Sequence, residues 1–121
     1  MDKEQTLQAF WSQFGVPAYD QGTVPDDAPL PRITYEVITD NIGSSNILSA
    51  SIWDRSQSWK SVTDILHQIE DKVGRGGQTL HCNGGIVWVN RGVPFAQRMT
   101  DTDDTIRRIL ISIEVEFITE V

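Results

Sequence analysis

The sequence predicts an α+β fold in which two helices pack on one face of a mostly antiparallel β-sheet. Two segments repeat large apolar residues at helical spacing, several others alternate apolar and polar residues, and an Asn-Gly pair joins two of the alternating segments. The elements follow in the order α, β, β, α, β, β, β. No repeat, low-complexity tract or linker interrupts them, so residues 1–121 are expected to form a single domain.

The first helix is predicted at the start of the chain. Large apolar residues recur at i, i+3, i+4 and i+7, which places them on one helical stripe: Leu7, Phe10, Trp11 and Phe14. Asp2 can cap this helix, with Gln5 three residues later, and Gly15 followed by Pro17 ends it. Residues 17–31 are rich in proline and are expected to form a connection that serves as a contact surface.

Two strands are predicted next. Residues 33–37 and 47–53 alternate in polarity, and residues 33–37 are also rich in β-branched and aromatic side chains. The intervening Asn41-Ile42-Gly43-Ser44 predicts a turn, so the two strands are expected to form an antiparallel hairpin.

The second helix has the clearest pattern. Its apolar residues keep helical spacing throughout: Trp59, Val62, Ile65, Leu66, Ile69 and Val73. Ser61 and Asp64 can form a capping box, and Ser58 is the alternative cap one turn earlier. The glycine-rich residues 74–77 end the helix.

A second hairpin and a long final strand complete the predicted sheet. Residues 79–82 and 85–89 flank Asn83-Gly84, a strong signal for a two-residue turn. Residues 91–105 have no periodicity and are predicted to be a long connection. In residues 109–117 one face is apolar and the other polar, which predicts an antiparallel sheet that is covered on one side only.

Composition excludes some classes of function. The formal net charge of −7 argues against tight nucleic-acid binding, because phosphate recognition needs a Lys/Arg surface, but it permits a surface past which DNA slides. Cys82 is the only cysteine, so no intrachain disulfide can form. The polar N-terminus has no apolar stretch of a secretory signal, and no run is long enough to span a bilayer, so folding in a cytoplasm is expected.

No constellation of residues indicates catalysis or a cofactor. His67 has no ligand partner at a metal-binding spacing, and the adjacent His81 and Cys82 point to opposite faces of a strand. A calcium loop starting at Asp101 would need Gly at residue 106 and Glu at residue 112, which are Ile and Ser. We therefore expect no catalytic residue, no metal site and no cofactor.

Two features suggest recognition surfaces. The segment from residue 91 to residue 99 combines residue types that are enriched at protein interfaces, so we expect contact residues there: Arg91, Pro94, Phe95, Arg98 and Met99. The alternative is that the apolar members of this set fold back over the core. The polar face of the sheet carries Glu36, Glu114 and Glu116, which would line a channel if this face surrounds one, or would be an ordinary wetted surface.

The sequence resembles a family of small proteins from the tail gene clusters of long-tailed phages. The resemblance covers nearly the whole chain, and its most specific part is the string from Arg91 to Met99. The other matching motifs are Phe10-Trp11, Gly15-Val16-Pro17-Ala18-Tyr19, Val24-Pro25, Leu30-Pro31, Ile33-Thr34-Tyr35, Ser51-Ile52-Trp53, Ser58-Trp59 and Ile106-Arg107-Arg108.

The resemblance implies a tail terminator or a related head–tail joining protein. Tail terminators form a six-subunit ring on the finished tail tube, stop its polymerisation and offer a docking face to the head connector. The implied partners are further copies of the chain, the tail tube protein and the connector protein, with genomic DNA only in transit and no membrane. The implied location is the virion, at the head–tail junction. The alternatives are another connector or minor capsid or tail component, an acidic DNA mimic, and a small hydrolase.

Overall fold

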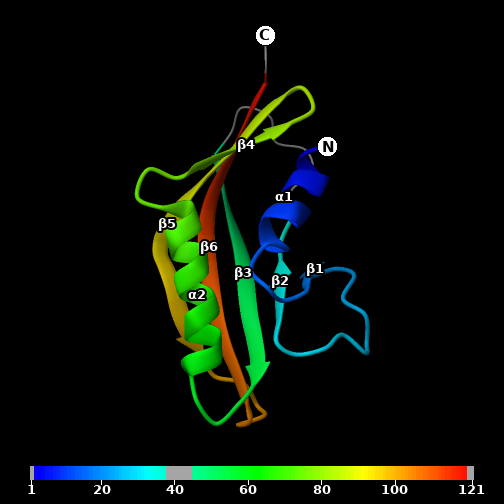
Figure 1. The fold of residues 1–121 in the computed structure, drawn as a ribbon, viewed down its shortest axis with the longest axis vertical. Helices are drawn as coiled ribbons and strands as arrows, with labels where there is room; N and C mark the ends of the chain where they lie inside the picture. Colours follow the sequence, from blue (N-terminus) through cyan, green and yellow to red (C-terminus); the bar gives the residue numbers. More distant parts are fainter. Residues whose placement is uncertain (1, 38–44, 120–121) are drawn as a thin grey trace.

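The computed structural model describes residues 2–37 and 45–119 as a curled six-stranded sheet with two helices, α1 (Lys3–Trp11) and α2 (Lys60–Val73) (Figure 1). In sheet order the strands are β1 (Ala18–Asp20), β2 (Arg32–Tyr35), β3 (Ser45–Arg55), β6 (Ile106–Thr119), β5 (Gly85–Met99) and β4 (Gln78–Cys82). β1 and β2 are parallel, and the other neighbours are antiparallel. Within the described ranges, no helix is long and apolar enough to cross a membrane.

The predicted α+β class is wrong. The fold is mostly β, with 46% of residues in strands and 21% in helices, and the sheet curls into a half-barrel. The error arises in residues 91–105, which the sequence predicts to be a connection. In the structure β5 continues to Met99 and pairs with β6, which already begins at Ile106. An unpredicted strand, β1, lies inside the proline-rich segment, where it pairs with β2.

The second hairpin is confirmed. β4 and β5 pair from Gln78↔Val89 to Cys82↔Gly85, and Gly84 has φ 82°, a left-handed conformation that glycine adopts without strain. β2 and β3 are antiparallel as predicted, whereas their predicted turn, residues 41–44, lies outside the described residues.

A bulge interrupts β5. The pairing with β6 shifts between Arg91 and Ala96, so the chain arches away from the ladder there. Gly92 sits at the start of this arch, where an added Cβ would lie 2.8 Å from both Cβ and the carbonyl oxygen of Ser112. Only glycine allows the two backbones to approach this closely. A bulge bends its strand and increases the local twist, which contributes to the curl of the sheet.

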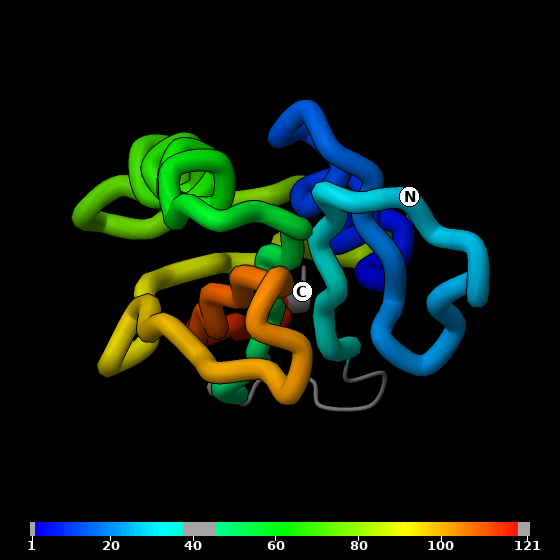
Figure 2. The backbone as a smooth tube through the Cα atoms, turned by 90° about the horizontal axis from the view of Figure 1, so that it is seen from below, coloured from blue at the N-terminus to red at the C-terminus, as the bar shows by residue number. Residues whose placement is uncertain are grey.

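Both helices lie on the same side of the sheet, as the view along the strands shows (Figure 2). We call the face beneath them the inner face and the opposite one the outer face. The alternation of β6 places its apolar residues on the inner face in one hydrophobic core: Ile109, Ile111, Ile113 and Val115. β3 adds Leu48, Ala50 and Ile52 to the same core.

Helix α1 begins and packs as its sequence predicts. Asp2 accepts a hydrogen bond from the Gln5 amide at 2.7 Å, and the Gln5 side chain accepts one from the Asp2 amide at 3.1 Å, which completes the capping box. The Trp11 ring stacks on Tyr35 of β2, with centroids 6.3 Å apart. The Tyr35 hydroxyl donates to Gln8 Oε1, and burial raises the pKa of this phenol.

Helix α2 buries its predicted stripe, Val62, Ile65, Ile69 and Val73, but begins differently from the capping-box prediction. The Ser61–Asp64 capping box is absent, because α2 already begins at Lys60, and the Asp64 carboxylate binds Lys60 Nζ at 2.8 Å instead. Ser58 is not the N-cap either: Trp59 holds that position with no side-chain cap hydrogen bond, and Ser58 Oγ, one residue earlier, accepts from the Lys60 amide at 3.1 Å. Gly74, with φ 67°, ends the helix.

Truncating an inner-face isoleucine should destabilise the protein strongly. Ile113 is 1% exposed and Ile47, on the adjacent strand, is 62% exposed. Ile113→Ala should lower the free energy of unfolding by about 2–5 kcal/mol, because it removes buried methyl groups and leaves a cavity. Ile47→Ala is the matched control and should change it by less than about 1 kcal/mol. Urea denaturation of both variants measures the difference, and equal losses would contradict the assignment of the two faces.

Candidate interaction surfaces

The side chains that could perform chemistry lie apart. His67 and His81 are exposed and Cys82 is half-buried, where burial raises the pKa of its thiol. Among residues 2–37 and 45–119, no three His, Cys, Asp or Glu side chains are grouped so as to hold a metal ion.

The acidic turn before β6 has a structural use. Asp103 accepts hydrogen bonds from the amide of Thr105 at 2.9 Å and from its hydroxyl at 2.7 Å. It also forms an ion pair with Arg55 at 3.1 Å, which ties this turn to the end of β3. The hydrogen bonds from Thr105, followed by the one from Arg55, lower the pKa of Asp103 to about 2.

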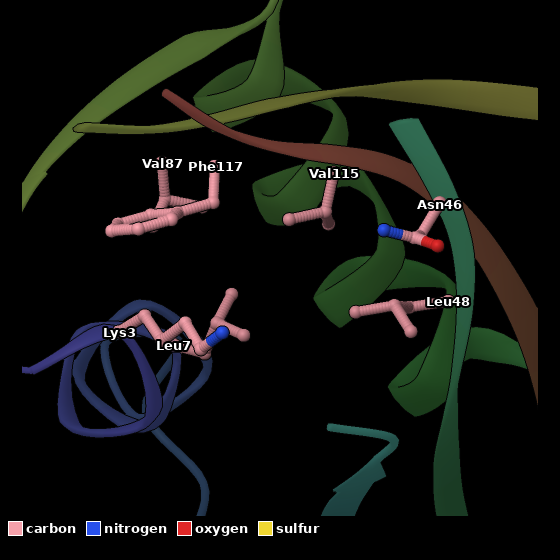
Figure 3. A pocket seen from close by; sticks show the side chains of 7 residues that line it. All are labelled: Lys3, Leu7, Asn46, Leu48, Val87, Val115 and Phe117. Atoms are coloured by element: carbon pink, nitrogen blue, oxygen red, sulfur yellow. The ribbon is translucent and has the colours of Figure 1, made fainter. Parts of the chain in front are cut away.

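A small pocket lies between α1 and the sheet (Figure 3). Its volume is about 20 Å³, which is room for about one water molecule. Its walls are mostly apolar, and the Lys3 ammonium lies 5.4 Å from the centroid of the Phe117 ring. The pocket is too small to hold a substrate. It is lined by Lys3, Leu7, Asn46, Leu48, Val87, Val115 and Phe117.

The predicted contact segment is the bulged part of β5, which we call the β5 bulge (residues 91–95), together with the strand end that follows it. Pro94 is exposed, and Val93 beside it is 98% exposed. The sequence analysis did not name Val93 as a contact residue. Its neighbours Gly92 and Pro94 both disfavour a regular central strand, so an apolar residue between them could have indicated an exposed tip.

Arg91 and Phe95 anchor the two sides of the β5 bulge. Phe95 is half-buried and packs against the core. The Arg91 guanidinium lies 5.5 Å from the centroid of the Phe95 ring, and its Nη2 donates to the carbonyl oxygen of Glu70 in α2 at 3.3 Å. The bulge is therefore fixed to the core and to α2 while its tip reaches solvent.

Beyond the bulge, Arg98 and Met99 point to opposite faces of the sheet. Arg98 pairs with Ile109 on the inner-face side, and its guanidinium lies 4.6 Å from the centroid of the Trp59 ring. Met99 pairs with Arg108 on the outer-face side and is half-buried. The structure thus divides the five predicted contact residues: Pro94 lies at the tip beside the unpredicted Val93, Arg91 and Phe95 support the tip, and Arg98 and Met99 lie beyond it.

The three predicted channel glutamates lie on the outer face of the sheet. Glu114 and Glu116 alternate with buried residues of β6, as the sequence predicts. Glu36 follows β2, with β3 between it and β6, and one of its carboxylate oxygens accepts from the amide of Ser49 at 2.6 Å and from its hydroxyl at 2.5 Å. Whether these glutamates line a channel stays a prediction.

The outer face is not uniformly acidic, because its other end carries a cation. Arg108 is the register partner of Trp53, and its guanidinium lies 4.5 Å from the centroid of that ring. Its Nε donates to Ser51 Oγ at 3.0 Å, and Trp53 Nε1 donates to Thr34 Oγ1 at 2.9 Å. The outer face therefore has a glutamate end and an arginine end.

An open groove of about 650 Å³ lies between the segment that follows α1 (residues 14–16) and the first turns of α2. Its apolar lining includes Phe14, Val16 and Ile65, and Lys60 and Asp64 also line it. The groove is a third candidate surface, separate from the β5 bulge and from the outer face.

The fold has a counterpart among solved structures. No protein-family model matches the sequence, and no curated protein matches it. A solved structure described as the virion of a native gene transfer agent particle contains a chain with a TM-score of 0.64 and 16% sequence identity. The match covers 94% of this chain and 90% of that chain, so the two share essentially the whole fold.

Removing the Thr105 hydroxyl should raise the pKa of Asp103. In the native protein this carboxyl should titrate at about 2, below its unfolded value of about 3.9, so it stabilises the fold above about pH 4 and that contribution is lost as the pH falls through about 2. Thr105→Val should move the pKa upward in a carboxyl-detected NMR titration. An unchanged value would show that the hydrogen bonds of Thr105 are not its cause.

Proposed function

We propose that this chain is a structural protein of a phage-like particle and, within that class, the tail terminator at the head–tail junction. The observation that carries the proposal is the match of nearly the whole fold to a chain of a gene transfer agent virion. The sequence resemblance to the tail-terminator family supports the narrower role. In this role the chain caps the tail tube as a six-subunit ring, stops its polymerisation and joins it to the head connector.

The surface of the chain suits assembly into a ring. A cyclic ring requires a heterologous interface, which means two different patches that complement each other on successive subunits. The β5 bulge, the outer face and the groove between the helices are chemically distinct surfaces. A formal net charge of −7 also suits a ring through which DNA passes without binding.

Another connector component, or a minor capsid or tail protein, is the second candidate, because the related chain belongs to a whole virion. An acidic DNA mimic is disfavoured. Such a protein needs an unbroken row of carboxylates, whereas Arg108 shares the outer face with Glu114 and Glu116.

Without this protein, the length of the phage tail should no longer be limited. A phage or prophage that lacks the gene should produce tails of irregular, excessive length together with heads that carry no tails, because nothing stops the tube or docks it. Electron microscopy of the lysate measures both. The same strain complemented with the gene is the control. Tails of normal length joined to heads would contradict the terminator role, and normal-length tails detached from heads would favour the second candidate.

The tip of the β5 bulge should matter for assembly rather than for folding. Val93→Asp should change the free energy of unfolding by less than about 0.5 kcal/mol, because the residue is 98% exposed, but should reduce incorporation into particles. Truncating a fully buried Phe lowers the free energy of unfolding by about 3–5 kcal/mol. Phe95 is half-buried, so Phe95→Ala should lower it by less.

The matched control for Val93→Asp is Thr79→Asp, which places the same charge at an exposed position of β4. Thermal unfolding and quantitative blots of purified particles measure the two effects. Full incorporation of the Val93→Asp protein would exclude the bulge tip from the contacts.

A further inference from the structure

Arg108 is held in one orientation on the outer face. Its guanidinium lies over the Trp53 ring at 4.5 Å, and its Nε is fixed by the hydrogen bond to Ser51 Oγ at 3.0 Å. Trp53 is itself held by its hydrogen bond to Thr34 Oγ1 at 2.9 Å. An arginine side chain is usually mobile, and binding a partner normally costs free energy to order it. Stacking on Trp53 and the hydrogen bond to Ser51 already restrict Arg108, so that cost of binding is smaller.

The two terminal nitrogens of Arg108 remain available. Neither Nη1 nor Nη2 of Arg108 has a hydrogen-bond acceptor among the described residues. Two other arginines at this end of the sheet are used within the chain: Arg55 pairs with Asp103, and Arg107 donates to the carbonyl oxygens of Asp104 and Gln57. A fixed guanidinium with both Nη groups free matches a carboxylate, which can accept two parallel hydrogen bonds.

A suitable carboxylate lies at the other end of the same face. Glu116 pairs in register with Ser45 of β3 and with Trp88 of β5, and is half-buried. Its carboxylate makes no hydrogen bond or ion pair with the described residues. From residue 108 to residue 116 a strand rises roughly 26 Å, so Arg108 and Glu116 cannot meet within one chain.

We propose that Arg108 binds the Glu116 carboxylate of a second copy of this chain. The contact joins the arginine end of one outer face to the glutamate end of the next copy, and it can repeat around a ring as a heterologous contact or form twice in a two-fold pair. It deepens the proposed function, on which it rests, by naming one pair of residues in the ring. A DNA phosphate is a less suitable occupant, because Glu114 and Glu116 on the same face repel a duplex.

Charge exchange tests the pair. The native protein should self-associate in sedimentation velocity at concentrations up to about 1 mM. Arg108→Glu and Glu116→Arg should each weaken this association by at least about tenfold, because each places like charges together. The double variant Arg108→Glu/Glu116→Arg restores opposite charges in exchanged positions and should recover most of the association.

Further variants separate the contact from effects on folding and from net charge. Arg108→Lys keeps the charge but lacks the planar fork, so it should lose part of the association while the protein remains folded. Arg75→Glu and Glu4→Arg change exposed residues away from the outer face and should leave association unchanged. Tryptophan fluorescence and thermal unfolding show whether the Arg108→Glu protein, in which Trp53 loses its stacked guanidinium, is still folded. If it is not, the association of the Glu116→Arg and Arg108→Lys proteins tests the contact.

Several results would overturn the contact. One is a single variant that self-associates as strongly as the native protein. Another is a double variant that associates no more strongly than the single variants, and a third is a native protein that stays monomeric up to about 1 mM. Duplex DNA binding that Arg108→Glu abolishes would assign Arg108 to phosphate. A Glu116→Arg protein that enters particles fully and only slows DNA ejection would place the face in a channel. Each of these outcomes leaves the tail-length test untouched, so the contact and the proposed function can fail separately.

Discussion

The pairing of β6 on both of its sides holds the fold together. β3 pairs with residues 106–116 of β6 and β5 pairs with residues 108–119, so the C-terminal strand is the centre of the sheet. Its inner residues fill the core beneath both helices. Removing β6 would leave two separate hairpin-like pieces, each with one apolar face exposed to water, and neither piece would bury enough surface to persist.

The bulge in β5 follows from this central position. β5 must remain paired with β6 near both of its ends, yet residues 92–95 have no partner in the ladder. The extra chain length is accommodated by an arch, which starts where Gly92 lies against Ser112 and ends where Phe95 packs on the core. The same constraint that bends the sheet therefore exposes Val93, and an apolar tip of this kind is the form of surface that protein partners use.

Local patterns in the sequence predict the helices, the Asn83–Gly84 turn and the two faces of the last strand, because each depends on residues close together in the chain. They fail at residues 91–99. Gly92 and Pro94 both disfavour a regular strand, and only the ladder with β6 keeps this segment extended. That ladder is a long-range interaction, so the β content was underestimated and the α+β class was wrong.

The candidate surfaces divide in the same way. Alternation along β6 alone places Glu114 and Glu116 on one face. The stack of Arg108 on Trp53 depends instead on the register of two strands that lie 55 residues apart (108 minus 53), and no spacing rule gives that register. The inner face packs in the core, whereas no described helix lies over the outer face, which is covered in part by its own long side chains. Ser51 is buried there, and Arg108 donates a hydrogen bond to it. A sheet face that keeps opposite charges roughly 26 Å apart repels an identical face placed over it with like ends together, but attracts one placed with opposite ends together. Successive copies of a ring meet this condition when the arginine end of each outer face reaches the glutamate end of the next, and a two-fold pair meets it twice.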